Sequence, residues 1–174
     1  MATDDPSDRI LVFAPIGRDG PASAELLRRA GLTAYVCQDL PGMVRELKVG
    51  AAAVFVAEEG LFGRDLGPLS AWIEAQPPWS DMPFVVLTSR HGQPRVAAWR
   101  RAAVEVLRNV SLLERPVQPI TLTSAVQTAC RARKRQHEVQ ALLAAREQAA
   151  AELEALVAAR TSQLKEADAE LLTQ

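Results

Sequence analysis

Two pairs of polar residues follow short apolar runs at places where their side chains can do chemistry. Glu58 and Glu59 come directly after the apolar run 52–57, and Thr88 and Ser89 end a second such run. If both runs are parallel strands, these side chains share the carboxyl edge of one sheet, where open α/β sheets bind ligands. The glutamates would then form an acidic pocket or a partner contact, and the hydroxyls would bind an anion. The simpler interpretation is a solvated loop and a turn-capping hydroxyl pair.

Histidine and cysteine offer little catalytic chemistry in this chain. His91 lies in a polar stretch that predicts exposure, and His137 precedes a glutamate within a helical pattern but lacks the flanking residues of a kinase phosphorylation site. Cys37 and Cys130 are far apart, without the spacing of metal ligands, and are best interpreted as small buried hydrophobic residues. The sequence therefore predicts no catalytic residue, no metal and no cofactor.

Charge and hydropathy also exclude several partners. The net charge is −1, and the basic run 131–135 carries no interleaved aromatics, so it is predicted to be a solvated helix face rather than a nucleic-acid contact. No apolar run reaches the roughly 18 residues of a membrane span. Trp79, in a loop rich in proline, is expected to be a partly exposed anchor for a protein contact. The chain is expected to be cytoplasmic, with no nucleic-acid or membrane partner.

The positioning elements follow from three zones of composition. Residues 1–8 are polar and predict a disordered tail. Residues 9–133 contain β-branched apolar runs separated by Gly and Pro, and predict one folded domain. From about residue 120 onward the chain has neither Gly nor Pro and is rich in Ala, Glu, Leu, Arg and Gln, which predicts one long helix. Residues 134–174 of that helix are expected to form a separate coiled-coil segment.

Short apolar strands and helical patterns alternate within the domain. The strands are predicted at 9–14, 32–37, 52–57, 84–88 and 110–113. The helices are predicted from the Asp19-Gly20-Pro21 start to Gly31, and at 41–49, 66–75 and 94–106. Strict alternation predicts an α/β fold with a parallel sheet covered by helices on both faces. Apolar residues without polar alternation should form its core, namely Leu11, Val12, Val54, Phe55, Val86 and Leu87.

The order and spacing of these elements over residues 9–133 resemble two-component receiver domains. Thr88 matches the family's switch Thr/Ser, and Arg115-Pro116 matches its Lys-Pro pair with Arg in place of Lys. The run ILVFA that begins at residue 10 matches the apolar part of the family's first strand. The resemblance implies a five-stranded doubly wound sheet of the receiver/flavodoxin-like kind and a role in phosphorelay signalling.

The phosphorylation chemistry of that family is missing. A receiver takes a phosphoryl group on an Asp at the end of its third strand and holds Mg²⁺ with that Asp and an acidic pair after its first strand. The matching positions here carry no carboxylate, and Glu58 lies one residue late, on the other face of a strand. Arginine also does not reproduce the geometry of lysine. The predicted degenerate site consists of Ala14, Pro15, Ala57, Thr88 and Arg115.

A heptad pattern marks the long helix. Apolar residues alternate at spacings of four and three, interrupted by Arg146 and Arg160. The apolar positions of this seam are Val139, Leu143, Ala150, Leu153, Val157, Leu164, Ala167 and Leu171. Such a seam predicts a parallel homodimer, and its two arginines predict that the dimer is weak.

The run 157–172 resembles the connector helices that precede the dimerisation helices of sensor histidine kinases. The whole chain therefore resembles the N-terminal part of a hybrid-type bacterial histidine kinase, ending before the kinase core. This implies a non-catalytic module that relays the state of a signalling partner through a dimeric coiled coil to that core. Two alternatives stay open: an unorthodox receiver phosphorylated on Glu58, and a small-ligand sensor that uses the vacant site at the edge of the sheet.

Overall fold

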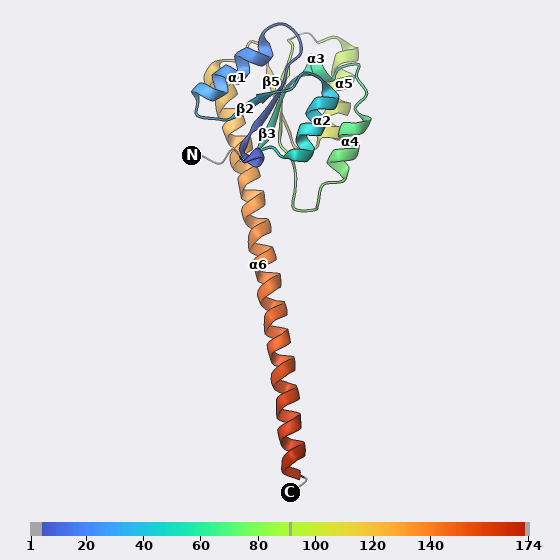
Figure 1. Ribbon diagram of the computed structural model, residues 1–174. Helices are drawn as coiled ribbons and strands as arrows, with labels where there is room; N and C mark the ends of the chain where they lie inside the picture. Colours follow the sequence, from blue (N-terminus) through green and yellow to red (C-terminus); the bar gives the residue numbers. More distant parts are fainter. Residues whose placement is uncertain (1–4, 91, 173–174) are drawn as a thin grey trace. The chain divides into compact units, whose positions relative to one another are not determined.

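The structure, a computed structural model, describes residues 5–90 and 92–172 (Figure 1). The chain divides into two compact units, Met1–Gln136 and His137–Gln174. This division lies three residues beyond the end that the sequence predicted for the first domain, at residue 133.

The first unit is built on a five-stranded sheet in which every neighbouring pair of strands is parallel. Its strand order is β2-β1-β3-β4-β5. The strands are β1 (Ile10–Phe13), β2 (Ala34–Val36), β3 (Ala53–Ala57), β4 (Phe84–Thr88) and β5 (Val110–Glu114). The predicted α/β fold with a doubly wound parallel sheet is therefore confirmed.

The helices include every one that the sequence predicted, with ends that differ by no more than two residues. They are α1 (Asp19–Arg29), α2 (Leu40–Val49), α3 (Glu58–Leu61), α4 (Gly67–Glu74), α5 (Pro94–Leu107) and α6 (Pro119–Leu172). The short α3 was not predicted, because four residues are too few to show a helical period. It forms directly after β3 and begins with the two glutamates, Glu58 and Glu59.

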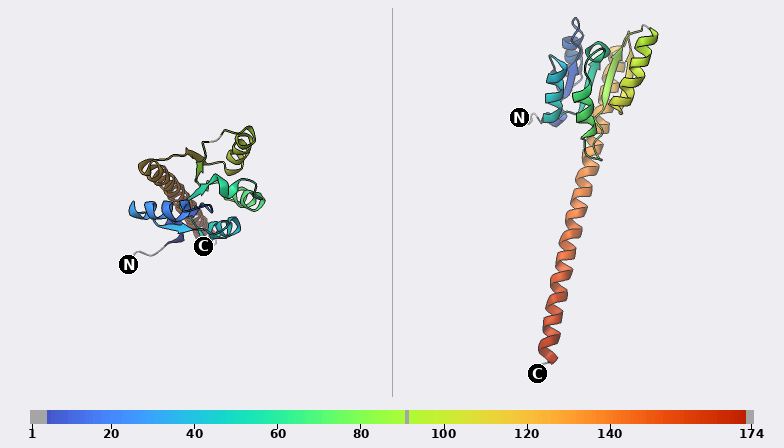
Figure 2. Two further views of the ribbon diagram at one scale, coloured as in Figure 1. Left: turned by 90° about the horizontal axis from the view of Figure 1, so that it is seen from above. Right: turned by 90° about the vertical axis from the view of Figure 1, so that its right-hand side faces the viewer.

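The core has two layers, one on each face of the sheet. Seen from above, α1 and the beginning of α6 cover one face, and α2, α4 and α5 cover the other (Figure 2). Alternate strand residues supply the two layers: Val12 and Phe55 pack toward α1 and α6, whereas Leu11 and Val54 pack toward α2 and α4. The six predicted core residues are all buried, as expected for strands covered on both faces.

The last strand, β5, is not buried on both faces as β1, β3 and β4 are. β5 is at the edge of the sheet, and Ser111, Leu112 and Glu114 are exposed. Its apolar run in the sequence does not distinguish a central strand from an edge strand, because position within a sheet depends on which strands pair.

The N-terminal tail is more ordered than predicted. Pro6–Asp8 form a 3₁₀ helix in which the Asp5 carboxylate accepts a 2.9 Å hydrogen bond from the Ser7 N–H. The Arg9 guanidinium then donates to the Gly50 carbonyl at 3.1 Å. An acidic cap and a proline in the first turn explain this local order. Residues 1–4 of the predicted tail lie outside the described residues.

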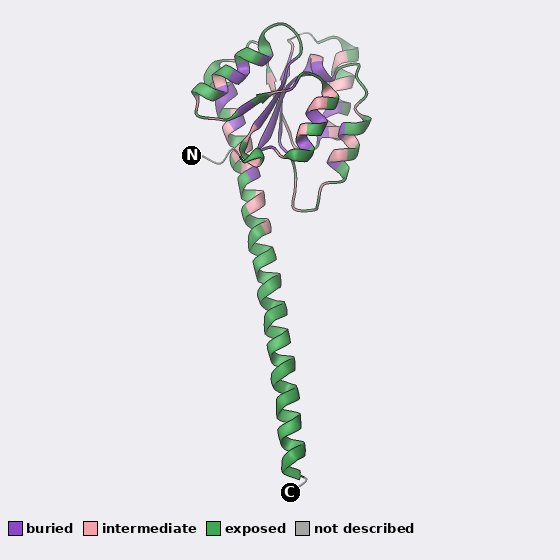
Figure 3. Ribbon diagram, viewed as in Figure 1, coloured by how far each residue is buried: buried purple, intermediate pink, exposed green. Residues whose placement is uncertain are grey.

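The second unit consists of the remainder of α6, in which every described residue from 141 to 172 is exposed (Figure 3). None of the helices in the described part of the chain is long and apolar enough to cross a membrane.

Candidate receiver-type site

The predicted degenerate site lies at the carboxyl edge of the sheet. Ala14 and Pro15 follow β1, Ala57 ends β3, Thr88 ends β4 and Arg115 follows β5. Because the strands are parallel and in register, these positions meet at one edge. Ala14 and Ala57 are buried. Their methyl side chains provide no oxygen ligand at the ends of the first and third strands.

Glu58 turns out to be a buried partner in an ion pair rather than part of a solvated loop. It is 4% exposed. The Arg100 guanidinium donates two hydrogen bonds to the Glu58 carboxylate, at 2.7 and 2.8 Å. The Ser89 N–H donates to the same carboxylate at 2.6 Å, and the Ser89 hydroxyl also donates to it. The solvated-loop interpretation is wrong for this residue because α3 turns its side chain toward β4 and α5.

These contacts set the charge of Glu58. Burial by itself raises the pKa of the carboxyl, but the hydrogen bonds from Arg100 and Ser89 outweigh burial and lower the pKa below its ordinary value. The same pair raises the pKa of Arg100, mainly through its hydrogen bond to Glu58. The glutamate is therefore held ionised, with both carboxylate oxygens in use.

Glu59 is paired in a second, separate cluster. Arg115 donates to the Glu59 carboxylate at 2.7 Å through Nη1, and to the Asp19 carboxylate at 2.8 Å through Nη2. Burial lowers the pKa of Arg115, but the hydrogen bonds to Glu59 and Asp19 more than reverse this and raise it. The arginine that replaces the family's lysine thus bridges two carboxylates of the chain itself.

The two hydroxyls at the end of β4 are also used internally. The Thr88 hydroxyl donates to the Leu113 carbonyl of β5 at 3.3 Å, and the Ser89 hydroxyl donates to Glu58. Neither one caps a turn as the simpler interpretation expected. Both join neighbouring segments at the edge of the sheet.

This arrangement suits a structural role better than a chemical one. Each glutamate is neutralised by an arginine, which leaves neither Glu58 nor Glu59 available to coordinate a cation. Within residues 5–90 and 92–172, no group of three or more His, Cys, Asp or Glu side chains lies close enough to hold a metal ion.

The remaining candidates from the sequence lie elsewhere. Burial raises the pKa of Cys37 to about 11 and that of Cys130 to about 11, so both thiols stay protonated and unreactive at neutral pH. His137 is on α6, at the start of the second unit, and His91 lies outside the described residues.

One cluster was missed by sequence reasoning. Arg133, in the basic run expected to be solvated, is only 8% exposed. Its Nη1 donates to the Ser80 hydroxyl at 2.7 Å and to the Gln136 amide oxygen at 2.8 Å. Its guanidinium also lies over the Trp79 ring, 5.5 Å from the centroid. Trp79 is half-buried and belongs to this intramolecular cluster.

The same cluster fixes the loop before β4. The Gln136 amide donates to the Asp81 carbonyl at 2.8 Å and accepts from the Asp81 N–H at 2.9 Å. The only sequence signal was the spacing of Arg133 and Gln136 by three residues, which places them on one side of a helix. No sequence pattern predicts that these two residues bind the loop at Ser80 and Asp81, which lies more than 50 residues earlier in the chain.

No protein-family model and no curated protein matches this chain. Solved structures do resemble it. Full-length FixJ from B. japonicum is 22% identical, with a TM-score of 0.58; the match covers 77% of this chain and 63% of FixJ. A response regulator receiver protein from Sinorhizobium medicae is 18% identical over 73% of this chain and 97% of its own, with a TM-score of 0.56.

A third similar structure contains a coiled-coil segment. It is a fusion that carries a trimeric coiled-coil segment of yeast Spc42; it is 21% identical over 86% of this chain and 96% of its own, with a TM-score of 0.56. At these identities the likeness concerns the fold. The first unit of this chain therefore has the fold of a response-regulator receiver domain.

Proposed function

We propose that this chain is a non-phosphorylatable receiver-like module of two-component signalling. In this proposal a signalling partner acts on the α/β domain, and a dimeric coiled coil transmits the resulting state to a histidine kinase core in the cytoplasm. The similar solved structures include response-regulator proteins, which supports the signalling context. The chain itself acts by contact and is not an enzyme.

One observation carries the proposal: the acidic residues nearest to the phosphorylation position are already neutralised by arginines. Phosphoryl transfer depends on a metal and on positioned charge at the transferred group. Glu58 has both oxygens bonded to Arg100 and Ser89, which argues against the alternative that it accepts the phosphoryl group. Arg115, at the lysine position, is likewise occupied by Glu59 and Asp19.

Acetyl phosphate with Mg²⁺ tests this directly. We expect intact-mass spectrometry of the full chain to show no phosphoryl adduct. The matched positive control restores the family's acidic set in the same chain through Ala14→Asp, Pro15→Asp and Ala57→Asp. A stable adduct on the unaltered chain anywhere in residues 9–118 would refute the proposal, and one that maps to Glu58 would establish the alternative.

The relay part of the proposal is supported by the exposed seam in the second unit. Leu143 is 49% exposed and Leu153 is 62% exposed. Apolar residues in a repeated heptad pattern gain stability when a second helix covers them. In a monomer, no described residue of the second unit covers these side chains.

A further inference from the structure

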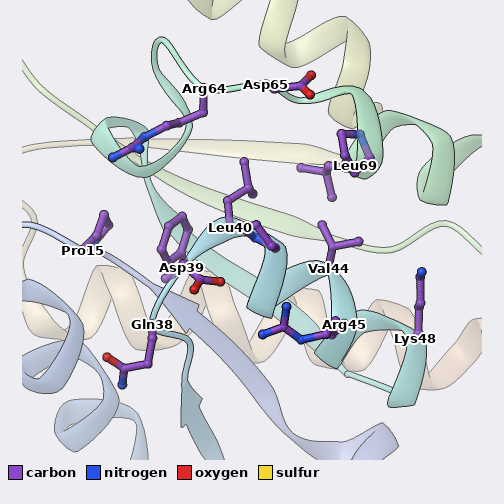
Figure 4. Close-up of a pocket in the computed structure, with 13 residues that line it drawn as sticks. Pro15, Gln38, Asp39, Leu40, Val44, Arg45, Lys48, Arg64, Asp65 and Leu69 are labelled. Atoms are coloured by element: carbon purple, nitrogen blue, oxygen red, sulfur yellow. The ribbon is translucent and has the colours of Figure 1, made fainter.

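A cavity of about 500 Å³ opens beside α2, on the face of the sheet opposite α1. Its volume is within the range of about 300–1,000 Å³ that small-molecule sites have in proteins. It lies between α2 and the segment that leads into α4 (Figure 4). The lining residues that the argument uses are Phe13, Leu40, Val44, Arg45, Lys48 and Arg64, with Leu69 at the start of α4.

The floor of the cavity is apolar. Phe13, Val44 and Leu69 are buried, and Leu40 is half-buried against the same core layer. Figure 4 shows Leu40 and Val44 extending from α2 toward Leu69. A ligand with an aromatic or branched aliphatic body would bind favourably here, because it would remove this apolar surface from water.

The rim carries three cations whose charged groups bond to no other described residue. Arg45 and Lys48 are on α2, and Arg64 is in the segment opposite (Figure 4). All three are exposed. None of their guanidinium or ammonium groups makes a hydrogen bond or an ion pair with another residue in the described part of the chain.

Two carboxylates also line the cavity, but local backbone groups already use them. Asp39 accepts a hydrogen bond from the Gly42 N–H at the start of α2. Asp65 accepts one from the Gly67 N–H at 2.9 Å, at the start of α4. These neutral donors leave the carboxylate charges in place, so three cations and two carboxylates give the lining a formal net charge of +1.

We infer that this cavity binds a small amphipathic anion: an apolar, aromatic or branched body that carries one carboxylate, sulfonate or phosphate group. The body lies on the floor formed by Phe13, Val44 and Leu69, and the anionic group lies at the rim cations. Pro15 of the degenerate site lines the cavity, but its other members, Ala14, Ala57, Thr88 and Arg115, do not, and neither does Glu58. Ligand binding in the cavity therefore does not depend on whether the chain can be phosphorylated, and the two are tested separately.

Fluorescence titration with anilinonaphthalene sulfonate tests the site, because this probe combines an aromatic body with one negative charge. The neutral phenylnaphthylamine is the matched probe without the charge. We expect saturable binding of the sulfonate to the full chain. The double variant Lys48→Glu/Arg64→Glu should weaken that binding by about tenfold or more, which corresponds to roughly 1.4 kcal/mol. Binding of the neutral probe should hardly change.

Two further variants locate the site. Leu40→Trp fills the cavity from the half-buried end of α2 and should remove binding of both probes. The double variant Arg95→Glu/Arg101→Glu, an equal charge reversal at two exposed positions of α5, should leave both titrations unchanged. Circular dichroism and the thermal midpoint check that each variant is folded. The inference is overturned if the sulfonate does not bind, or if Leu40→Trp or the charge reversals on the rim leave its affinity unchanged.

Discussion

Two arginines neutralise the acidic residues at the carboxyl edge of the sheet, and they are not equally buried. Arg100 and Glu58 form the more buried pair, with side chains 20% and 5% exposed. Arg115, Glu59 and Asp19 are more accessible, with side chains 27 to 50% exposed. Solvent weakens the second cluster, so the first should matter more for stability.

Replacing Arg100 with Met should destabilise the fold, because it leaves the Glu58 carboxylate buried without its counter-ion. Removing one partner of a buried pair typically costs about 3–5 kcal/mol. Since Arg100 is partly accessible, we expect about 3 kcal/mol in urea denaturation at neutral pH. Arg101→Met, its exposed neighbour on α5, is the matched control and should change little. Equal effects of the two substitutions would contradict this account.

The pH dependence of stability should also change in the Arg100→Met variant. In the unaltered chain the pKa of Glu58 is below its ordinary value of 4.5, so its stabilising contribution is lost as the pH falls below 4.5. Without Arg100, burial is opposed only by Ser89, and the pKa should rise above the ordinary value. The carboxyl then stabilises the fold at low pH and ceases to do so as the pH rises. The difference in free energy of unfolding between the unaltered chain and the Arg100→Met variant should therefore become smaller as the pH is lowered.

At the scale of single elements, β3 is the central strand of the sheet. It pairs with β1 on one side and with β4 on the other, and all five of its residues are buried. We expect Phe55→Ala to cost about 3–5 kcal/mol, the usual range for a buried Phe truncated to Ala. Thermal or urea denaturation measures this loss. A midpoint close to that of the unaltered chain would show that the ring is not part of the core.

The contact between α6 and the loop before β4 gives a second prediction for an element. Arg133→Met keeps the apolar stem but removes the hydrogen bonds to Ser80 and Gln136, and should cost about 1–2 kcal/mol. Hydrogen exchange at the Asp81 amide, which donates to Gln136, should become faster. Arg135→Met, an exposed position of the same basic run, is the control. Unchanged exchange at Asp81 would show that Arg133 does not hold this loop.

For the whole molecule, we predict assembly through the second unit. Sedimentation over a concentration series should show the full chain as a weak dimer and a fragment of residues 1–138 as a folded monomer. The fragment keeps both core layers, which end within the first unit. A fragment that stays dimeric, or a full chain that forms a trimer, would contradict the predicted homodimer.

The two arginines of the seam provide the matched test. Replacing Arg146 and Arg160 with Leu should tighten the dimer by at least about tenfold, or roughly 1.4 kcal/mol. The control adds the same two leucines at Gln148 and Ser162, which are on the opposite side of the helix in the heptad pattern. Equal tightening by the control would indicate general hydrophobic association rather than a specific seam.

Local features of the sequence were sufficient to predict the five strands and the helices other than α3 and the 3₁₀ helix at Pro6–Asp8. Continuous apolar runs mark buried strands, and Gly, Pro and the three- and four-residue spacing of apolar side chains mark helices, because these properties depend on residues near in sequence. The missing carboxylates at Ala14, Pro15 and Ala57 could likewise be identified from residue type and order alone. The heptad seam of the long helix could also be identified from residue type and spacing alone.

The partners of the polar residues were decided only by the tertiary structure. Glu58 meets Arg100 across 42 residues, and Glu59 meets Arg115 across 56. Arg133 became buried because folding brought the loop at Ser80 against α6. A sequence pattern reports which face a side chain occupies but not what packs against that face. Ion pairs, the edge position of β5 and the cavity beside α2 all depend on contacts between distant segments.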